Sequence, residues 1–195
     1  ALANVGFHIE TYVGGGVAPI ATRVALAVVI MLICLIGGRI VPSFTRNWQL
    51  KREGPLPAVT GPFDMVTLVV TALALVGWTI LPESHLIGIA LTAAGLLNLV
   101  RLARWRGWAT TAEPLVLILH LGCLWLGVGL VLVGAAAIWP QGLTASAGLH
   151  ALTAGAVGVM TLAVMTRAGR GHTGPPLTAG WSGSLIYILI TLAAL

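Results

Sequence analysis

Charged residues are scarce in this chain, where aspartate, glutamate, lysine and arginine together make up only 8% of the 195 residues. A soluble domain carries roughly 25% charged residues, so this sequence lacks the material for a water-exposed surface. Apolar residues account for 58% of the chain, and its mean hydropathy is +1.01. The composition therefore favours a membrane-embedded protein over a soluble one.

Signatures of several common enzyme and redox classes are also missing. The sequence contains no P-loop, no G-x-S-x-G, no H-E-x-x-H and no C-x-x-C-H, which argues against the corresponding NTPase, hydrolase and c-type haem classes. Only two cysteines occur, Cys34 and Cys123, and both lie in apolar runs, where packing or soft-metal binding is expected rather than a disulfide. No cleavable signal peptide is recognised. We expect one transmembrane domain over residues 1–195, truncated at both ends.

The sequence does contain a series of apolar runs, and a membrane span needs about 20 such residues. Five runs are complete and predict helices over residues 19–41, 64–82, 85–102, 113–138 and 145–167. Two more are incomplete, one over residues 1–9 and one starting near Trp181, so about six to seven spans are expected. Short connections between helices of this length predict an all-α, polytopic transmembrane helical bundle.

Residues 37–48, GGRIVPSFTRNW, close the first complete run. Two glycines, a proline and a Ser/Thr pair are expected to stop the helix there, and a basic cluster follows. An apolar run followed by such a cluster is typical of a helix that leaves the membrane on the cytoplasmic side.

Basic and base-free connections then alternate along the chain. The basic ones hold Arg46, Lys51 and Arg52, then Arg101, Arg104 and Arg106, then Arg167 and Arg170. The intervening connections carry no base, and Arg23 is the one exception to the pattern. This alternation predicts a multi-pass membrane protein with loops 42–63, 102–112 and 168–180 in the cytoplasm. It also explains the net charge of +5 without nucleic acid as a partner.

Two histidines lie inside predicted spans, where polar groups are expensive and therefore candidates for function. His120 is about two turns from the cytoplasmic end of its span, and His150 is about two turns from the outer end of the next. At a rise of about 1.5 Å per residue their depths differ by roughly 10–15 Å, so we do not expect one metal ion between them. Two separate sites, or opposite edges of a large planar cofactor, remain open, since imidazole suits haem iron or copper.

Other residues are weaker candidates for metal ligands, and some of them carry sulfur. His8 and His85 are expected towards the outer face, whereas Cys34, His120 and Met160 are expected at a similar depth nearer the cytoplasm. Thiolate and thioether suit copper(I), so Cys34 and Met160 form a candidate pair. The alternative is plain packing, because a lone intramembrane histidine is often a hydrogen-bond partner of another helix.

Other polar residues have simpler explanations. Asn98, Arg101 and Trp105 share one helix face and either anchor the helix at the interface or grip an anionic group such as a haem propionate or a lipid phosphate. Glu113 precedes a proline and is expected to cap the next helix, with pairing to Arg101 or Arg104 as the alternative. Small residues in two neighbouring spans predict close helix contact: Gly88, Thr92, Gly95, Gly127 and Gly134.

Several stretches together resemble the NnrS family. They are residues 37–48, 101–108 (RLARWRGW), Glu113-Pro114 with His120-Leu121-Gly122, residues 150–153 with 160–167, and Gly171-His172-Thr173-Gly174. The resemblance covers nearly the whole chain and implies a polytopic inner-membrane protein that contains haem and copper and is linked to denitrification and protection against nitric oxide. Family members are about twice this length, so the chain corresponds to their C-terminal part, without the His-rich motif of the N-terminal half.

The resemblance also indicates which candidate residues are expected to bind the cofactors. His8, His120, His150 and His172 fall in stretches that match the family and are the expected cofactor-binding histidines, with His120 and His150 as metal ligands. Arg39 and Arg46 are expected to position helices or bind an anionic group, as is Arg101.

Three hypotheses follow for the function. The first is a haem- or copper-binding protein that handles nitric oxide, and whether the gas is consumed, sensed or only bound stays open, as do enzymatic activity and oligomeric state. The second is a transporter or channel for a small solute or metal, although no pair of broken helices points to a midplane site. The third is an assembly factor without chemistry of its own.

Overall fold

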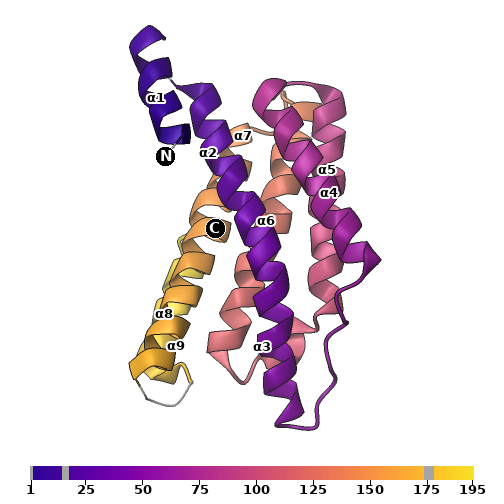
Figure 1. The fold of residues 1–195 in the computed structure, drawn as a ribbon, viewed down its shortest axis with the longest axis vertical. Coiled ribbons are helices and arrows are strands. Elements are labelled where there is room, and N and C mark those ends of the chain that lie inside the picture. The colour runs from indigo at the N-terminus through magenta and orange to yellow at the C-terminus, as the bar shows by residue number, and fades with distance from the viewer. Residues whose placement is uncertain (1, 15–17, 174–177) are drawn as a thin grey trace.

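The computed structural model describes residues 2–14, 18–173 and 178–195, except for the side chains at 172 and 173, and the regular structure in these ranges is entirely helical. In chain order the α-helices are α1 (Leu2–Val13), α2 (Pro19–Leu32), α3 (Gly38–Leu50), α4 (Pro62–Ile80), α5 (His85–Arg104), α6 (Pro114–Ile138), α7 (Ala145–His150), α8 (Val159–Thr173) and α9 (Gly180–Leu192). Figure 1 shows an elongated bundle with most helix axes along its length. The predicted all-α fold is confirmed.

Two π-helical segments join pairs of these helices into longer ones. Ile33–Gly37 joins α2 to α3, and Ala151–Gly158 joins α7 to α8. Within the described residues, five helices are long and apolar enough to cross a membrane: Pro19–Leu50, Pro62–Ile80, His85–Arg104, Pro114–Ile138 and Ala145–Gly171. They coincide with the five complete spans expected from the sequence. The shorter helices α1 and α9 coincide with the two incomplete runs.

The predicted helix stop in residues 37–48 is wrong, because the first long helix continues to Leu50. The connection to α4 therefore covers residues 51–61 rather than 42–63. Packing explains the difference. The buried residues of α3 recur at helical spacing and form one face against the bundle: Gly38, Val41, Pro42, Thr45 and Gln49. Burial of such a face stabilises a helix more than intrinsic propensity does.

Local geometry also accommodates the proline inside this helix. Pro42 cannot donate a backbone hydrogen bond and would ordinarily break or kink the helix. The wider π turn ends at Gly37, shortly before it, and the Thr45 hydroxyl donates to the Val41 carbonyl at 2.8 Å. A π turn of this kind is a known way to relieve such a break.

Two other predicted loops are shorter than expected. α5 continues to Arg104 and is followed by a 3₁₀ turn over Gly107–Thr110, so little of residues 102–112 is irregular. α8 continues to Thr173, so the first part of residues 168–180 is helical. The basic side chains in these segments therefore extend from helix ends rather than from flexible loops.

The α3–α4 and α5–α6 connections lie at one end of the bundle, together with the end of α8 and the start of α9, and the α4–α5 and α6–α7 connections lie at the other end (Figure 1). The Ala58 N–H donates to the Arg104 carbonyl at 3.0 Å, and Gln49 Nε2 donates to the Ala109 carbonyl at 2.8 Å. The Ala179 N–H donates to Glu113 Oε1 at 3.1 Å. The alternation predicted from loop charge thus corresponds to two distinct ends of the structure.

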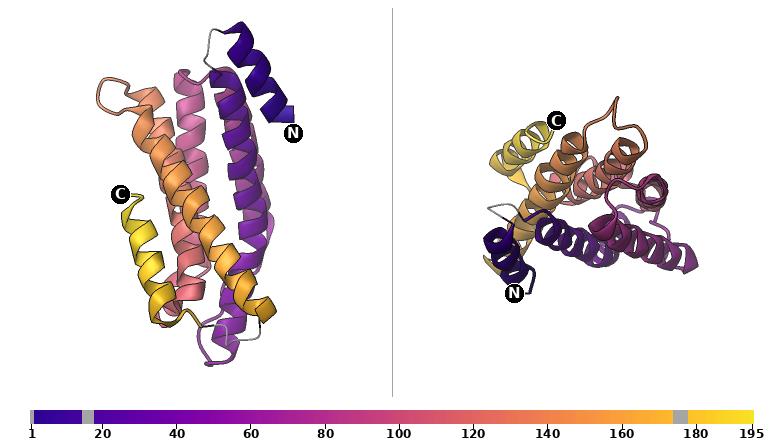
Figure 2. Two further views of the ribbon diagram at one scale, coloured as in Figure 1. Left: turned by 90° about the vertical axis from the view of Figure 1, so that its left-hand side faces the viewer. Right: turned by 90° about the horizontal axis from the view of Figure 1, so that it is seen from above.

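Helix α6 forms the centre of the bundle, since it contacts α3, α5, α7, α8 and α9 and has buried residues on every side. One apolar cluster contains Ile30, Leu91 and Leu130, and a second contains Leu119 and Val159. Figure 2 shows α1 and α9 at the periphery. Large apolar side chains such as those of Leu73, Leu86 and Met165 are exposed on outer faces, which is the pattern expected of a surface in contact with lipid.

Glycines allow α5 and α6 to approach closely, as the small residues in their sequences predicted. A Cβ atom added to Gly95 would lie 2.7 Å from the Gly127 carbonyl oxygen. A Cβ atom added to Gly134 would lie 2.5 Å from the Gly88 carbonyl oxygen. Neither position can hold a larger residue unless the two backbones move apart.

Glu113→Ala is expected to lower the free energy of unfolding by about 1–2 kcal/mol. Glu113 is buried, and its Oε1 accepts from the N–H groups of Leu115 and Ala179, so it caps α6 and also holds the start of α9. Unfolding of the purified protein by SDS in mixed micelles measures the change. Glu83→Ala removes an exposed carboxylate from a base-free connection and serves as the control. Equal losses in the two variants would contradict the capping role.

Candidate functional site

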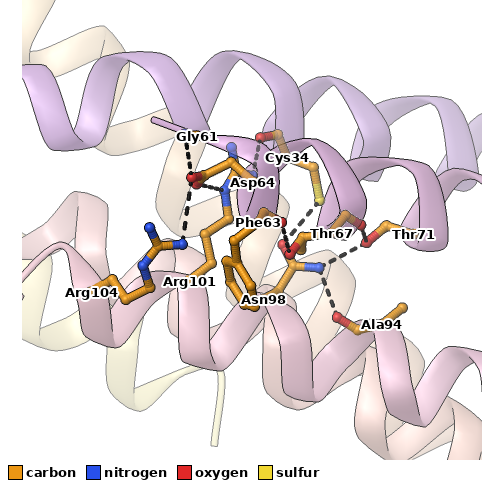
Figure 3. Close-up of polar contacts among 10 residues, drawn as sticks. All are labelled: Cys34, Gly61, Phe63, Asp64, Thr67, Thr71, Ala94, Asn98, Arg101 and Arg104. Atoms are coloured by element: carbon orange, nitrogen blue, oxygen red, sulfur yellow. Dashed lines mark hydrogen bonds and ion pairs between the residues drawn. The ribbon is translucent and has the colours of Figure 1, made fainter. Parts of the chain in front are cut away.

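A buried ion pair joins α4 to α5 near the end with the basic connections (Figure 3). Arg101 Nε donates to Asp64 Oδ1 at 2.8 Å, and both side chains are only 3% exposed. Arg104 approaches the other carboxylate oxygen at 3.6 Å, and the Gly61 N–H donates to that oxygen at 3.1 Å. A charge inside an apolar bundle requires such a set of partners. The ion pair therefore fixes the relative position of the two helices.

Further polar contacts extend from this pair towards the middle of the bundle. Arg101 Nη1 donates to the Cys34 carbonyl at 3.0 Å, which adds the first long helix to the network. Asn98 Nδ2 donates to Thr71 Oγ1 and to the Ala94 carbonyl, both at 2.9 Å (Figure 3). Three spans are thus connected by hydrogen bonds in a region that is otherwise apolar.

The predicted shared face of Asn98, Arg101 and Trp105 is confirmed, and all three residues are buried. The alternative pairing of Glu113 with Arg101 or Arg104 is wrong. Glu113 instead caps α6, as its position before a proline indicated, while both arginines pair with Asp64. Whether Arg101 also contacts an anionic group stays a prediction.

Asp64 is the charged member of this network that the sequence reasoning missed, and Thr71 was missed as well. The available signal was a lone carboxylate two residues after Pro62, at the start of an apolar run. A charge at that depth requires a partner, and the connections on the same end of the bundle offer only a few basic side chains.

His120 occupies a second polar site, deep in the same half of the bundle. Its side chain is 4% exposed, and its Nε2 lies 2.8 Å from Thr45 Oγ1. The single hydroxyl proton of Thr45 is donated to the Val41 carbonyl, so Thr45 Oγ1 accepts from His120 Nε2–H. Nδ1 is then the nitrogen with the free lone pair. It is buried and has no hydrogen-bond partner among the described residues.

Gly107 packs against this side of the ring. A Cβ atom added to Gly107 would lie 2.5 Å from His120 Nδ1, so only glycine lets the 3₁₀ turn approach the imidazole this closely. Gly107 and His120 both line a cavity of about 340 Å³ whose other walls are almost entirely apolar, formed by Leu99, Leu102, Ala103, Trp108, Leu117, Leu121 and Leu124. An unpartnered imidazole nitrogen beside an apolar cavity fits a ligand to a haem iron or to copper.

The other predicted ligands lie apart from His120. His150 is exposed at the end of α7, and the neighbouring Gly148 packs against Val133 near the far end of α6. Val133 is roughly 20 Å along α6 from His120 at the usual helical rise. These two histidines therefore do not share one metal ion, as their predicted depths indicated.

His8, Arg39 and Arg46 are exposed and lie outside the buried networks. His8 is on the peripheral helix α1, where its ring contacts Phe7 edge to face. The backbone of His172 belongs to the last turn of α8 rather than to a loop, and its side chain lies outside the described residues. Cofactor binding by these four residues stays a prediction.

Over the described residues, no three side chains of His, Cys, Asp or Glu come together in a way that could hold a metal ion. A metal bound within these ranges would therefore take fewer ligands of these types or would also use methionine. If His120 supplies one nitrogen ligand, a second partner is required from elsewhere.

The comparisons with known proteins give one match. The family described as "NnrS protein" matches residues 1–195, which is the whole chain. No curated protein and no solved structure matches it. The match extends over both polar sites described above, and it agrees with the five long apolar helices. The chain belongs to the NnrS family.

Proposed function

We propose that this protein binds haem and copper in the bacterial inner membrane and acts in the response to nitric oxide, in protection from nitrosative stress or in denitrification. Membership of the family supports, at the level of the family, a membrane protein related to nitric oxide. The observation that carries the cofactor proposal is His120, which lines an apolar cavity and whose buried Nδ1 has no partner among the described residues.

The residues around His120 suit this task. The Thr45 hydroxyl accepts from Nε2–H, which leaves the lone pair of the neutral imidazole on Nδ1. Gly107 presents no side chain to that nitrogen, and the apolar walls of the cavity exclude water while they admit a small neutral gas. A haem iron or copper ion bound there would supply the coordination site for nitric oxide. Whether the gas is consumed or only bound depends on that group.

The membrane orientation is part of the proposal. Lys51, Arg52 and Arg106 are exposed at the end where the basic connections meet, which supports a cytoplasmic position for loops 42–63, 102–112 and 168–180. The exposed apolar helix faces support a lipid bilayer as the main partner, and they leave surface for an oligomer.

An optical spectrum and a metal analysis of the purified full-length protein test the cofactor proposal. His120→Ala is expected to lose most of a Soret band that the unchanged protein shows, because its Nδ1 is the candidate ligand. His150→Ala tests the second predicted ligand in the same way, and His85→Ala is the control, because His85 is exposed at the start of α5, at the other end of the bundle. A colourless, metal-free protein, or a His120→Ala variant with full haem content, would refute the proposal.

Transport of a small solute is the second candidate, and one observation favours it. A cavity of about 740 Å³ lies at the end with the base-free connections, and Arg23, Glu83 and His85 are among its lining residues. An arginine inside a span is expected to serve a function. Solute flux into liposomes that contain a metal-free protein would support transport, provided that Arg23→Ala reduces the flux.

A further inference from the structure

Three sulfur-containing side chains from three helices come together around the π turn Ile33–Gly37. Cys34 is part of this turn, Cys123 lies in the middle of α6, and Met160 is the second residue of α8, just after the second π segment. Their side chains are buried, with exposed fractions of 4%, 9% and 5%. A Cβ atom added to Gly37 would lie 3.7 Å from Cys123 Sγ and 3.8 Å from Met160 Cε. The thiol and the thioether therefore both reach the turn that carries Cys34.

A small void lies beside the two thiols. It measures about 10 Å³ and is lined by Cys34 and Cys123 together with Ile33, Gly38, Asn98, Trp105 and Leu126. This volume is about that of one water-sized probe, which is also enough for one desolvated metal ion. Cys34 Sγ lies 3.7 Å from Asn98 Oδ1, a weak contact that a thiol can exchange for a metal.

The backbone around the cluster departs from α-helical geometry. π-helical segments are rare and are often found at functional sites, and this chain has two, each carrying or leading into one of the sulfur ligands. Glycine at 122 leaves room for the methionine, since a Cβ atom there would lie 3.2 Å from Met160 Cε. The first π turn also accommodates Pro42, whereas the second π segment contains no proline.

A cationic side chain lies beside the cluster. The Arg101 guanidinium donates to the Cys34 carbonyl at 3.0 Å, so a positive group lies next to the cluster. Metal is bound by the thiolate form, and the guanidinium complements the negative charge of such a complex. Two thiolates and a thioether are soft ligands that select monovalent copper over harder divalent ions.

We propose that Cys34, Cys123 and Met160 form a binding site for one thiophilic monovalent cation, copper(I) or its analogue silver(I). Binding of one such ion by two thiols releases two protons and gives a complex with one net negative charge beside Arg101. The inference rests on the copper part of the proposed function and assigns that copper to sulfur rather than to His120.

Competition of the full-length, anaerobically purified protein with a chromophoric copper(I) chelator tests the site. Cys34→Ser and Cys123→Ser are each expected to weaken copper(I) binding by on the order of 100-fold, and Met160→Leu by about 10-fold. Met165→Leu is the matched control, because Met165 lies on the same helix and is 66% exposed, and its affinity should equal that of the unchanged protein. Unchanged affinity in the Cys34→Ser/Cys123→Ser double variant would overturn the proposal.

X-ray absorption at the copper edge provides a measurement that needs no variant. A first shell composed only of sulfur supports the site, whereas a shell dominated by nitrogen or oxygen overturns it. The Soret band of the same samples separates this inference from the haem proposal. Cysteine variants that lose copper(I) but keep the band support the sulfur site. Variants that keep copper(I) refute it, whatever the state of the haem.

Discussion

Replacement of Arg101 by leucine is expected to lower the free energy of unfolding by about 3–5 kcal/mol. The substitution leaves the Asp64 carboxylate 3% exposed in an apolar bundle, with Arg104 at 3.6 Å as its remaining charged partner. It also removes the hydrogen bond to the Cys34 carbonyl that connects the first span. Since a domain of this kind is stable by only about 5–15 kcal/mol, we expect a low yield of folded protein and a clear shift in SDS-induced unfolding.

Two further variants show whether the loss comes from the unpaired charge. Arg52→Leu removes an exposed arginine that only lies over the Trp48 ring at 3.9 Å, so its cost should stay below about 1 kcal/mol. Asp64→Asn combined with Arg101→Leu removes both charges and should be less destabilised than the sum of the two single variants. Strict additivity would show that the side chains act independently, contrary to the ion pair.

The sequence predicted the membrane spans well, because their signal is the length of an apolar run. The runs over residues 64–82 and 85–102 correspond to α4 and α5, since no other structure satisfies the backbone across lipid. The sequence did not predict that the first helix continues through Pro42. Glycine, proline and threonine are local signals, and the buried face that overrides them exists only once α3 packs against α6.

Partner choice inside the bundle was less accessible from the sequence. Helical spacing correctly placed Asn98 and Arg101 on one face, since that relation is internal to one helix. The pairing of Arg101 with Asp64 depends on how α4 packs against α5. In the same way, the contact of His120 with Thr45 depends on how α6 packs against α3. Equal depth in the membrane limits the number of possible partners for a buried polar side chain, but it does not identify the partner.

The same limit applies to the sulfur cluster. Similar depth suggested Cys34 with Met160, but it did not identify Cys123, because depth says nothing about which side of a central helix a residue faces. The two π segments change that facing by altering the helical register, and no pattern in the sequence reveals them.

Gly134→Ala is expected to destabilise the protein by about 3 kcal/mol, which is large for the addition of one methyl group. The new Cβ atom would lie 2.5 Å from the Gly88 carbonyl oxygen and 2.7 Å from the Thr92 backbone nitrogen. Both are backbone atoms within α5, so no side-chain rotation relieves the overlap. The helices must separate, and the dispersion contacts that hold neighbouring spans together in lipid are then lost along their length.

Gly183→Ala makes the same chemical change in a setting without this contact. Gly183 lies inside α9, and its added Cβ atom would lie 3.7 Å from the Ala179 Cβ atom, an ordinary van der Waals distance. Alanine is the better helix former by about 1 kcal/mol, so this variant should be neutral or slightly stabilised in the same SDS titration. The opposite signs expected for the two variants isolate the α5–α6 contact from helix propensity. Destabilisation of both by similar amounts would mean that the close approach of α5 and α6 does not determine stability.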